Sequence, residues 1–336
     1  MRDRQLLIVS PAARAQNNGN WQSASRWAHF LRAHYRVRIA SGWSADQPAP
    51  ALLIALHARR SAASLAAFRA AHPARPAILV LTGTDLYRDI GEDRAAQAAL
   101  RQADALVLLQ PDGMDALPAA LRAKARVIYQ SAPALRPYPR SAAPRHLDIC
   151  MLGHLRAEKD PLTFMRASAL LRDADARLRL LHIGAALEPA LGAAAAAAQA
   201  ADPRYRWLGA LAHGAARQRL KRSHAMVIAS RMEGGANVVI EAVTSGVPVL
   251  ASDISGNRGM LGADYAGYFP LGDAAALAAL IERSVADPAF YALLRAQCAA
   301  RAILFDPAAE RAAVLDLVDN LLHAQSIPSI TETEPS

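Results

Sequence analysis

The sequence predicts an α/β fold with two doubly wound parallel sheets that follow one another along the chain. Three observations support this. Short apolar runs alternate with helical segments over most of the sequence, a proline-rich stretch interrupts them near the middle, and 336 residues suffice for two domains. With 53% hydrophobic and 20% charged residues, the composition favours a globular protein over a disordered one.

The first half contains six apolar runs typical of buried strands, and a helix over residues 21–34 follows the first of them. The runs span residues 6–10, 37–40, 52–56, 78–81, 105–109 and 126–129. Four prolines then mark residues 131–146 as a linker. We therefore expect a first domain over residues 1–140.

The pattern restarts with a strand at residues 147–152 and a helix over 160–171. Further strands are expected at 178–183, 205–208, 225–229 and 247–251, and a long helical stretch over 275–325. This predicts a second domain over 147–305, with a ligand-binding cleft between the domains. We expect a helix over 306–325 that packs back on the first domain, and a disordered tail over 326–336.

The charge balance is basic, with 38 Lys and Arg against 29 Asp and Glu, a formal charge of +9 and a pI near 10.0. This excess suits nucleic acid, a membrane surface or an anionic small molecule. Because aromatic residues are few and no groove-reading motif is present, nucleic acid is disfavoured as a partner.

No apolar run approaches ~20 residues and the N-terminus has no signal-peptide pattern, so we expect a cytoplasmic protein without membrane insertion. Cys150 and Cys298 lack zinc-site or disulfide-framework spacing.

Polar side chains follow three predicted strands of the first half. They are Asn18, Gly19 and Asn20 after the first strand, His57, Arg59 and Arg60 after another, and Thr84, Asp85 and Arg88 after a third. Each group taken alone is equally compatible with an ordinary turn or a solvated surface. Because ligands of such sheets bind at the carboxyl ends of the strands, the three groups together indicate a site.

In the second half, Arg156 and Lys159 follow the strand at 147–152 and are spaced to converge on one anion, although surface solvation also explains such a pair. The most specific stretch begins at Ser230. There a predicted strand is followed by Glu233, the glycine turn Gly234-Gly235, and a helix whose first amides face the ligand of that turn. Glu241 lies early in this helix, so two glutamates bracket the turn.

These motifs resemble the donor half of GT-B glycosyltransferases of the family-4 type, which carry two glutamates with seven residues between them and a following Gly-x-Pro, here Gly246 to Pro248. The resemblance covers nearly the whole chain and implies a GT-B fold, in which two Rossmann-like domains face each other across a cleft. It implies that Glu241 holds the ribose of a nucleotide sugar, that Glu233 contacts the sugar, and that cations neutralise the diphosphate. The donor site would comprise Gly19, Arg156, Lys159, Glu233, Gly234, Gly235, Ala236, Asn237 and Glu241. The chain departs from the family pattern at His154, where Arg is usual.

The three first-half segments resemble the selenosugar synthases of selenoneine biosynthesis. This resemblance implies transfer of a sugar from UDP-glucose or UDP-N-acetylglucosamine to the selenium of selenophosphate. The acceptor-binding residues would be Asn18, Asn20, Arg59, Arg60, Thr84, Asp85 and Arg88. The catalytic residues would be His57, Arg156, Lys159 and Glu233.

We expect no metal or other cofactor, because GT-B enzymes stabilise the leaving group with cations and a helix N-terminus. The sequence Asp173-Ala174-Asp175 is interpreted as a solvated connection, with metal binding as its alternative. Three other functions stay open: a family-4 enzyme with an alcohol acceptor, a nucleotide-sugar epimerase, and a basic nucleic-acid-binding protein. The preferred UDP-sugar, the anomeric outcome, the group that assists selenium–phosphorus hydrolysis and the oligomeric state are not determined by the sequence.

Overall fold

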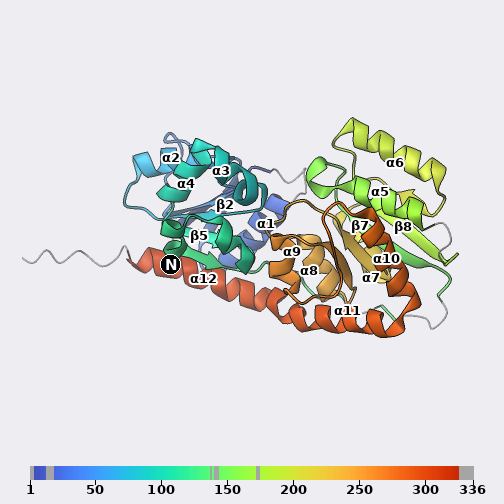
Figure 1. Ribbon diagram of the computed structural model, residues 1–336. Helices are drawn as coiled ribbons and strands as arrows, with labels where there is room; N and C mark the ends of the chain where they lie inside the picture. The colour runs from blue at the N-terminus through green and yellow to red at the C-terminus, as the bar shows by residue number, and fades with distance from the viewer. Residues whose placement is uncertain (1–3, 13–18, 137, 140–143, 172–174, 325–336) are drawn as a thin grey trace, which may run out of the picture. The chain divides into compact units, whose positions relative to one another are not determined.

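A computed structural model of the chain describes residues 4–12, 19–136, 138–139, 144–171 and 175–324 (Figure 1). They form two compact units. The first takes the described residues up to Leu109, then Met114–Ile128 and those from Ala308 onward, and the second takes Gln110–Gly113 and Tyr129–Pro307. Asn18, Asp173 and the predicted tail over 326–336 lie outside the described residues.

The first unit contains a six-stranded sheet in the order β2-β1-β3-β4-β5-β6, in which every pair is parallel. Its strands are β1 (Gln5–Val9), β2 (Arg36–Ala40), β3 (Leu52–Leu56), β4 (Ala77–Val80), β5 (Ala105–Leu108) and β6 (Ala125–Val127). All residues of β3, β4 and β5 are buried, as expected for a parallel sheet with both faces covered.

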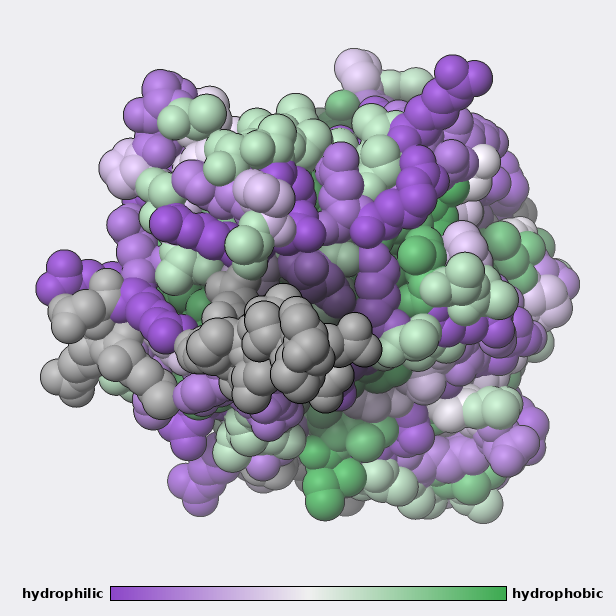
Figure 2. All heavy atoms as spheres, turned by 90° about the vertical axis from the view of Figure 1, so that its left-hand side faces the viewer, coloured by the Kyte–Doolittle hydropathy of each residue, from purple (hydrophilic) through white to green (hydrophobic). Residues whose placement is uncertain are grey.

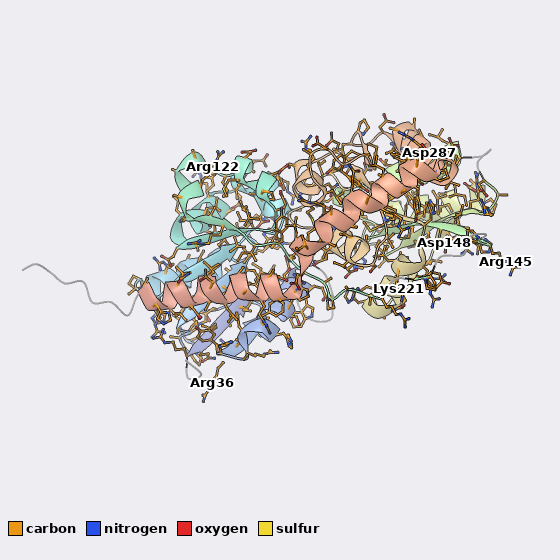
Figure 3. All side chains as sticks on the ribbon, turned by 90° about the horizontal axis from the view of Figure 1, so that it is seen from below. Arg36, Arg122, Arg145, Asp148, Lys221 and Asp287 are labelled. Atoms are coloured by element: carbon orange, nitrogen blue, oxygen red, sulfur yellow. The ribbon has the colours of Figure 1, made fainter. Side chains whose placement is uncertain are left out.

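Helices cover both faces of this sheet. They are α1 (Gly19–Leu31), α2 (Ala62–Ala71), α3 (Ile90–Glu92), α4 (Arg94–Gln102) and α12 (Pro307–Ala324), with a π-helix over Asp85–Asp89 and 3₁₀ helices over Pro111–Ala116 and Ala119–Lys124. Because side chains alternate along a strand, Leu6 and Ile8 pack with α1 and α12 on one face, whereas Leu7 and Val9 pack with α2 and α4 on the other. Figure 3 shows α12 along the strands of the first unit.

The second unit contains a six-stranded parallel sheet in the order β12-β11-β10-β7-β8-β9. Its strands are β7 (Leu147–Leu152), β8 (Leu178–Ile183), β9 (Tyr205–Trp207), β10 (Ala225–Ile228), β11 (Val249–Ser252) and β12 (Tyr268–Phe269). Its helices are α5 (Pro161–Leu170), α6 (Pro189–Ala201), α7 (His213–Arg222), α8 (Asn237–Thr244), α9 (Ser255–Leu261), α10 (Ala274–Ala286) and α11 (Pro288–Arg301), with 3₁₀ helices over Ala157–Lys159 and Ala302–Phe305.

The helical stretch predicted over 275–325 contains α10, α11 and α12 in the structure, and α12 falls within the helix expected over 306–325. Both junctions between these helices have an aspartate followed by a proline at the first helical position, namely Asp287-Pro288 and Asp306-Pro307. Asp287 accepts hydrogen bonds from the backbone N–H groups of Ala289 and Phe290, so it caps α11. The edge strand β12 is absent from the prediction, since two residues carry no readable period.

Candidate functional site

In the second unit, the loops after β7, β8 and β10 meet at the carboxyl edge of the sheet. The loop after β7 begins at Gly153, and the loop after β8 begins at Gly184. A Cβ on Gly184 would lie 1.9 Å from the carbonyl oxygen of Gly153, so these two backbones approach more closely than any other residue at position 184 permits. A glycine at 184 therefore sets the path of the loop that carries Arg156 and Lys159.

Glu233 and Lys159 join the loop after β10 to the loop after β7. Lys159 Nζ donates to Glu233 Oε1 at 2.5 Å, and the glutamate is buried. A Cβ on Gly256, in the first turn of α9, would lie 2.0 Å from the carbonyl oxygen of Glu233, so the backbone of α9 packs closely against this glutamate. The structure thus brings together two of the side chains that the sequence assigned to the site.

Glu241 is a buried carboxylate on α8 that receives two groups from α7. His213 Nε2 lies 2.6 Å from Glu241 Oε1, and Arg217 Nε lies 3.9 Å from the same oxygen. Neither His213 nor Arg217 was selected from the sequence. Their position in the sequence could have indicated them. They follow the strand at Tyr205–Trp207, so the start of α7 lies at the same edge of the sheet as the other loops.

Arg156 and His154 lie on the loop after β7. Burial lowers the pKa of His154, and the charges of Arg156 and Lys159 lower it further. His154 Nδ1 accepts a hydrogen bond from the backbone N–H of Ala185 at 3.1 Å, which ties the loops after β7 and β8 together. The residue that departs from the family pattern is therefore held neutral, and the positive charges of this loop belong to Arg156 and Lys159.

The start of α8 provides backbone donors. Ala236 precedes the helix in an extended conformation and its N–H donates to Met260 Sδ at 3.2 Å. Gly234 and Gly235 form the turn before it, and Asn237 is the first helical residue. The first amides of a helix have no partners within it and favour an anion or polar ligand.

In the first unit, His57 directly follows β3. Its backbone has φ 72°, a left-handed conformation that is uncommon for a residue with a side chain, and its side chain is only 3% exposed. Nε2 lies 3.1 Å from Thr84 Oγ1, and Nδ1 accepts a hydrogen bond from the Arg60 N–H at 3.4 Å. Burial lowers the pKa of His57, so the ring is neutral at pH 7.

Asp85 joins two loops of the first unit. Its Oδ2 accepts from the Ala58 N–H at 2.9 Å, and its Oδ1 accepts from the N–H groups of Thr82 and Gly83 at 2.9 and 2.8 Å. The residue is fully buried. This carboxylate therefore holds the loop after β3 against the loop after β4 through three backbone hydrogen bonds.

Arg59 and Arg88 converge on a second carboxylate of the first unit, Asp89, at the end of the π-helix. Arg88 Nε lies 3.1 Å and Arg59 Nη1 lies 3.6 Å from Asp89 Oδ1. Arg60 is exposed beside them and its charge lowers the pKa of His57. Asp89 was not selected from the sequence, which carried no signal beyond its place in the segment after β4.

The remaining predicted residues lie at the start of α1. Gly19 is the first residue of this helix and its carbonyl accepts from Ser23 Oγ at 2.8 Å, while Asn20 is half-buried. Asn18 lies outside the described residues. The structure therefore places Gly19 and Asn20 after β1, at the same edge of the sheet as His57 and Thr84.

Asp175 pairs with Arg177 through Oδ2 and Nη2 at 2.6 Å. Within the residues that the structure describes, no group of three His, Cys, Asp or Glu side chains is placed to hold a metal ion. No helix in the described part of the chain is long and apolar enough to cross a membrane.

Much of the basic charge lies away from these loops. Arg36, Arg145 and Lys221 project from the surface in Figure 3. On the face shown in Figure 2, hydrophilic side chains are interspersed with hydrophobic ones. The net charge of the chain is therefore spread over its surface as well as over the two groups of loops.

Residues 141–304 match the protein family described as "Glycosyl transferases group 1". The fold is similar to that of HepE from Anabaena in complex with UDP and glucose, with a TM-score of 0.74 and 15% identity over 94% of this chain and 100% of that chain. It is also similar to sucrose-phosphate synthase from Thermosynechococcus elongatus, with a TM-score of 0.77 and 18% identity over 96% and 100% of the two chains. The pneumococcal O-GlcNAc transferase GtfA, in complex with UDP and GlcNAc, gives a TM-score of 0.64 and 16% identity over 81% and 57%. A comparison with curated protein sequences finds no match.

Proposed function

We propose that this chain, which has the GT-B fold and a group 1 glycosyltransferase domain over residues 141–304, transfers a sugar from a UDP-sugar to the selenium of selenophosphate. The donor is UDP-glucose or UDP-N-acetylglucosamine, and the product is a 1-selenosugar for selenoneine biosynthesis. HepE from Anabaena, one of the similar structures, was determined in complex with UDP-glucose, which supports a donor of this class.

The observation that carries the donor assignment is the pair of buried carboxylates on either side of the glycine turn. Glu241 accepts hydrogen bonds from the ribose hydroxyls, and Glu233 accepts one from the sugar. Lys159 lies 2.5 Å from Glu233, and we assign this lysine to the diphosphate that joins ribose and sugar. Arg156 adds a second cation from the same loop, and the amides of α8 add further donors.

The acceptor assignment is supported by the arginines of the first unit. Arg59, Arg60 and Arg88 lie on the loops after β3 and β4, and guanidinium groups suit the phosphoryl oxygens of selenophosphate. His57 lies between these loops, where it orients bound groups or balances their charge. Because the selenium of selenophosphate is anionic and strongly nucleophilic, the reaction needs no general base.

The proposed reaction has two steps, glycosyl transfer to selenium and hydrolysis of the selenium–phosphorus bond. A selenium electron pair forms the bond to the anomeric carbon, and UDP leaves with the electron pair of the broken carbon–oxygen bond. Water then cleaves the selenium–phosphorus bond, which releases phosphate and the selenosugar.

Mass spectrometry of the products tests this proposal. The purified protein is given each UDP-sugar with and without enzymatically generated selenophosphate, and we expect UDP and a selenium-containing sugar only when both substrates are present. UDP release with a sugar or lipid alcohol, and no selenium-containing product, would overturn the acceptor assignment. Conversion of the nucleotide sugar alone would instead indicate an epimerase.

A variant pair tests the donor site in the same assay. Glu241→Gln removes a charged hydrogen-bond acceptor, so we expect kcat/KM for the UDP-sugar to fall about 10- to 100-fold. Glu282→Gln, an exposed substitution on α10, is the matched control and should retain the activity of the unmodified protein.

A further inference from the structure

The hydrogen bonds of His57 determine which ring nitrogen carries its proton. Nδ1 accepts from the backbone N–H of Arg60, so in the neutral ring the proton is on Nε2. Nε2 lies 3.1 Å from Thr84 Oγ1 and therefore donates to that oxygen. Both nitrogens of this buried ring are thus engaged, and neither is available to accept a proton from a substrate.

This arrangement fixes the role of the Thr84 hydroxyl. A threonine hydroxyl has one proton to donate, and its oxygen already accepts from His57. Among the described residues, Thr84 makes no further side-chain hydrogen bond, although it lies at the N-cap of the π-helix. The hydroxyl proton of Thr84 can therefore be donated to a bound ligand. Thr84 is half-buried, so a ligand can reach this hydroxyl.

Asp89 is the carboxylate that pairs with the arginines near this hydroxyl. The residue is only 4% exposed, and its Oδ2 has no hydrogen bond and lies 3.9 Å from His57 Nε2. Its Oδ1 draws in Arg59 and Arg88, whose side chains are 51% and 44% exposed. Asp93, which is 33% exposed and lies 4.0 Å from Arg59 Nε, adds one outer carboxylate. The Asp89 carboxylate is therefore buried, whereas the two guanidinium groups that it pairs with are about half exposed to solvent.

We propose that His57 is a positioning residue, which holds the Thr84 hydroxyl as a hydrogen-bond donor to a phosphoryl-type oxyanion bound between Arg59 and Arg88. Asp89 holds both arginines through its Oδ1. This inference rests on the proposed function only for the identity of the ligand as the acceptor. The site itself is defined by residues of the first unit alone.

The backbone conformation of His57, with φ 72°, also supports a functional role for this site. A positive φ is strained for a residue with a side chain, and such residues gather at ligand sites. π-Helices are rare in proteins, and those that occur are often at functional sites. This one places Thr84, Arg88 and Asp89 on one wide turn.

Binding of inorganic phosphate, measured by calorimetry, tests the site without any sugar donor. Thr84→Val keeps the shape of the side chain and removes the donor, so the Kd for phosphate should rise about 10- to 100-fold, and Thr84→Ser should restore it. Arg101→Ala is the matched control, because this exposed arginine lies at the far end of α4 and should leave the Kd unchanged. No phosphate binding by the unmodified protein, or equal affinity in Thr84→Val, would overturn the inference.

Turnover separates positioning from general-base catalysis at His57. The amide of His57→Gln can donate to Thr84 but cannot accept a proton at neutral pH. We expect kcat/KM for the acceptor to fall less than about tenfold, with an unchanged pH profile. A general base would instead cost about 100- to 10,000-fold, and this result would overturn the inference.

The two proposals fail in distinguishable ways. If phosphate binds as described but no selenium-containing sugar forms, the site stands and the proposed acceptor is wrong. Thermal unfolding of each variant identifies any loss that comes from misfolding, and Thr84→Ser then decides the outcome.

Discussion

Glu233 and Glu241 illustrate how single residues of the second unit are positioned. Each is buried on a loop or helix after β10, and each meets a nitrogen-bearing side chain from another part of the sheet edge: Lys159 for Glu233, and His213 with Arg217 for Glu241. A buried carboxylate without such partners would be costly. These contacts therefore orient the two carboxylates before a ligand arrives.

His182 gives a pH-dependent prediction at the same scale. It is fully buried on β8, its Nδ1 lies 2.9 Å from the Tyr205 hydroxyl, and burial lowers its pKa to about 4. Because the unfolded chain binds a proton at this histidine near pH 6.5 and the folded chain does not, the stability it contributes is full above pH 6.5. It is lost as the pH falls towards 4.

We expect this residue to account for roughly 3 kcal/mol of the fall in unfolding free energy between pH 6.5 and pH 4. Urea unfolding measured across this range should show a shallower pH dependence in His182→Gln. His34→Gln replaces an exposed histidine and should keep the original slope. Parallel slopes in all three proteins would contradict the prediction.

At the scale of elements, α12 is attached to α1 by a buried charge. Glu310 accepts from Arg26 Nε at 2.7 Å and from Trp27 Nε1 at 2.8 Å, and it is buried between the two helices. The apolar side chains of α12 pack on the same face of the sheet as those of α1. A segment about 290 residues distant in sequence thus supports the helix that begins at Gly19.

Removing this carboxylate takes one acceptor away from a largely buried guanidinium and another from a buried indole N–H. We expect Glu310→Ala to lower the unfolding free energy of the first unit by about 3 kcal/mol in urea unfolding followed by circular dichroism. Asp316→Ala, an exposed substitution on the same helix, should change it by less than about 0.5 kcal/mol. Equal stability of the two variants would show that the apolar contacts alone hold α12.

At the scale of the whole molecule, the two units have separate cores. Two hydrophobic clusters cover the faces of the first sheet and a third fills the second unit. A ligand of one unit therefore stabilises that unit first. This lets hydrogen exchange report where the donor binds.

We expect UDP at about 100 times its Kd to raise the local opening free energy of the donor loops by up to about 2.7 kcal/mol. Slowed exchange should appear in peptides over residues 153–160 and 230–241, and at the start of α7. Peptides over residues 57–61 and 82–89 of the first unit should change little. Protection confined to the first unit would contradict the donor assignment.

The order of elements was largely predictable because buried parallel strands are continuous apolar runs. The strands at 52–56 and 147–152 match the prediction to the residue, whereas the ends of α1 and β6 do not, because caps and edges depend on few residues. Glycine and proline punctuation located the turn at Gly234. It did not separate α10 from α11, since their Asp-Pro junction lies inside an otherwise unbroken helical composition.

The sequence by itself determined two parallel sheets, the loops that carry Glu233, Glu241 and the arginines, and the resemblance to a GT-B enzyme. These features follow from the periodicity of apolar residues and from the spacing of motifs, and both can be read along the sequence. Only the tertiary structure decided which side chains pair: Lys159 with Glu233, His213 with Glu241, and Arg59 with Asp89. Such pairs join loops that follow different strands, and their distances depend on the register of the sheet and the path of each backbone, which no local pattern records.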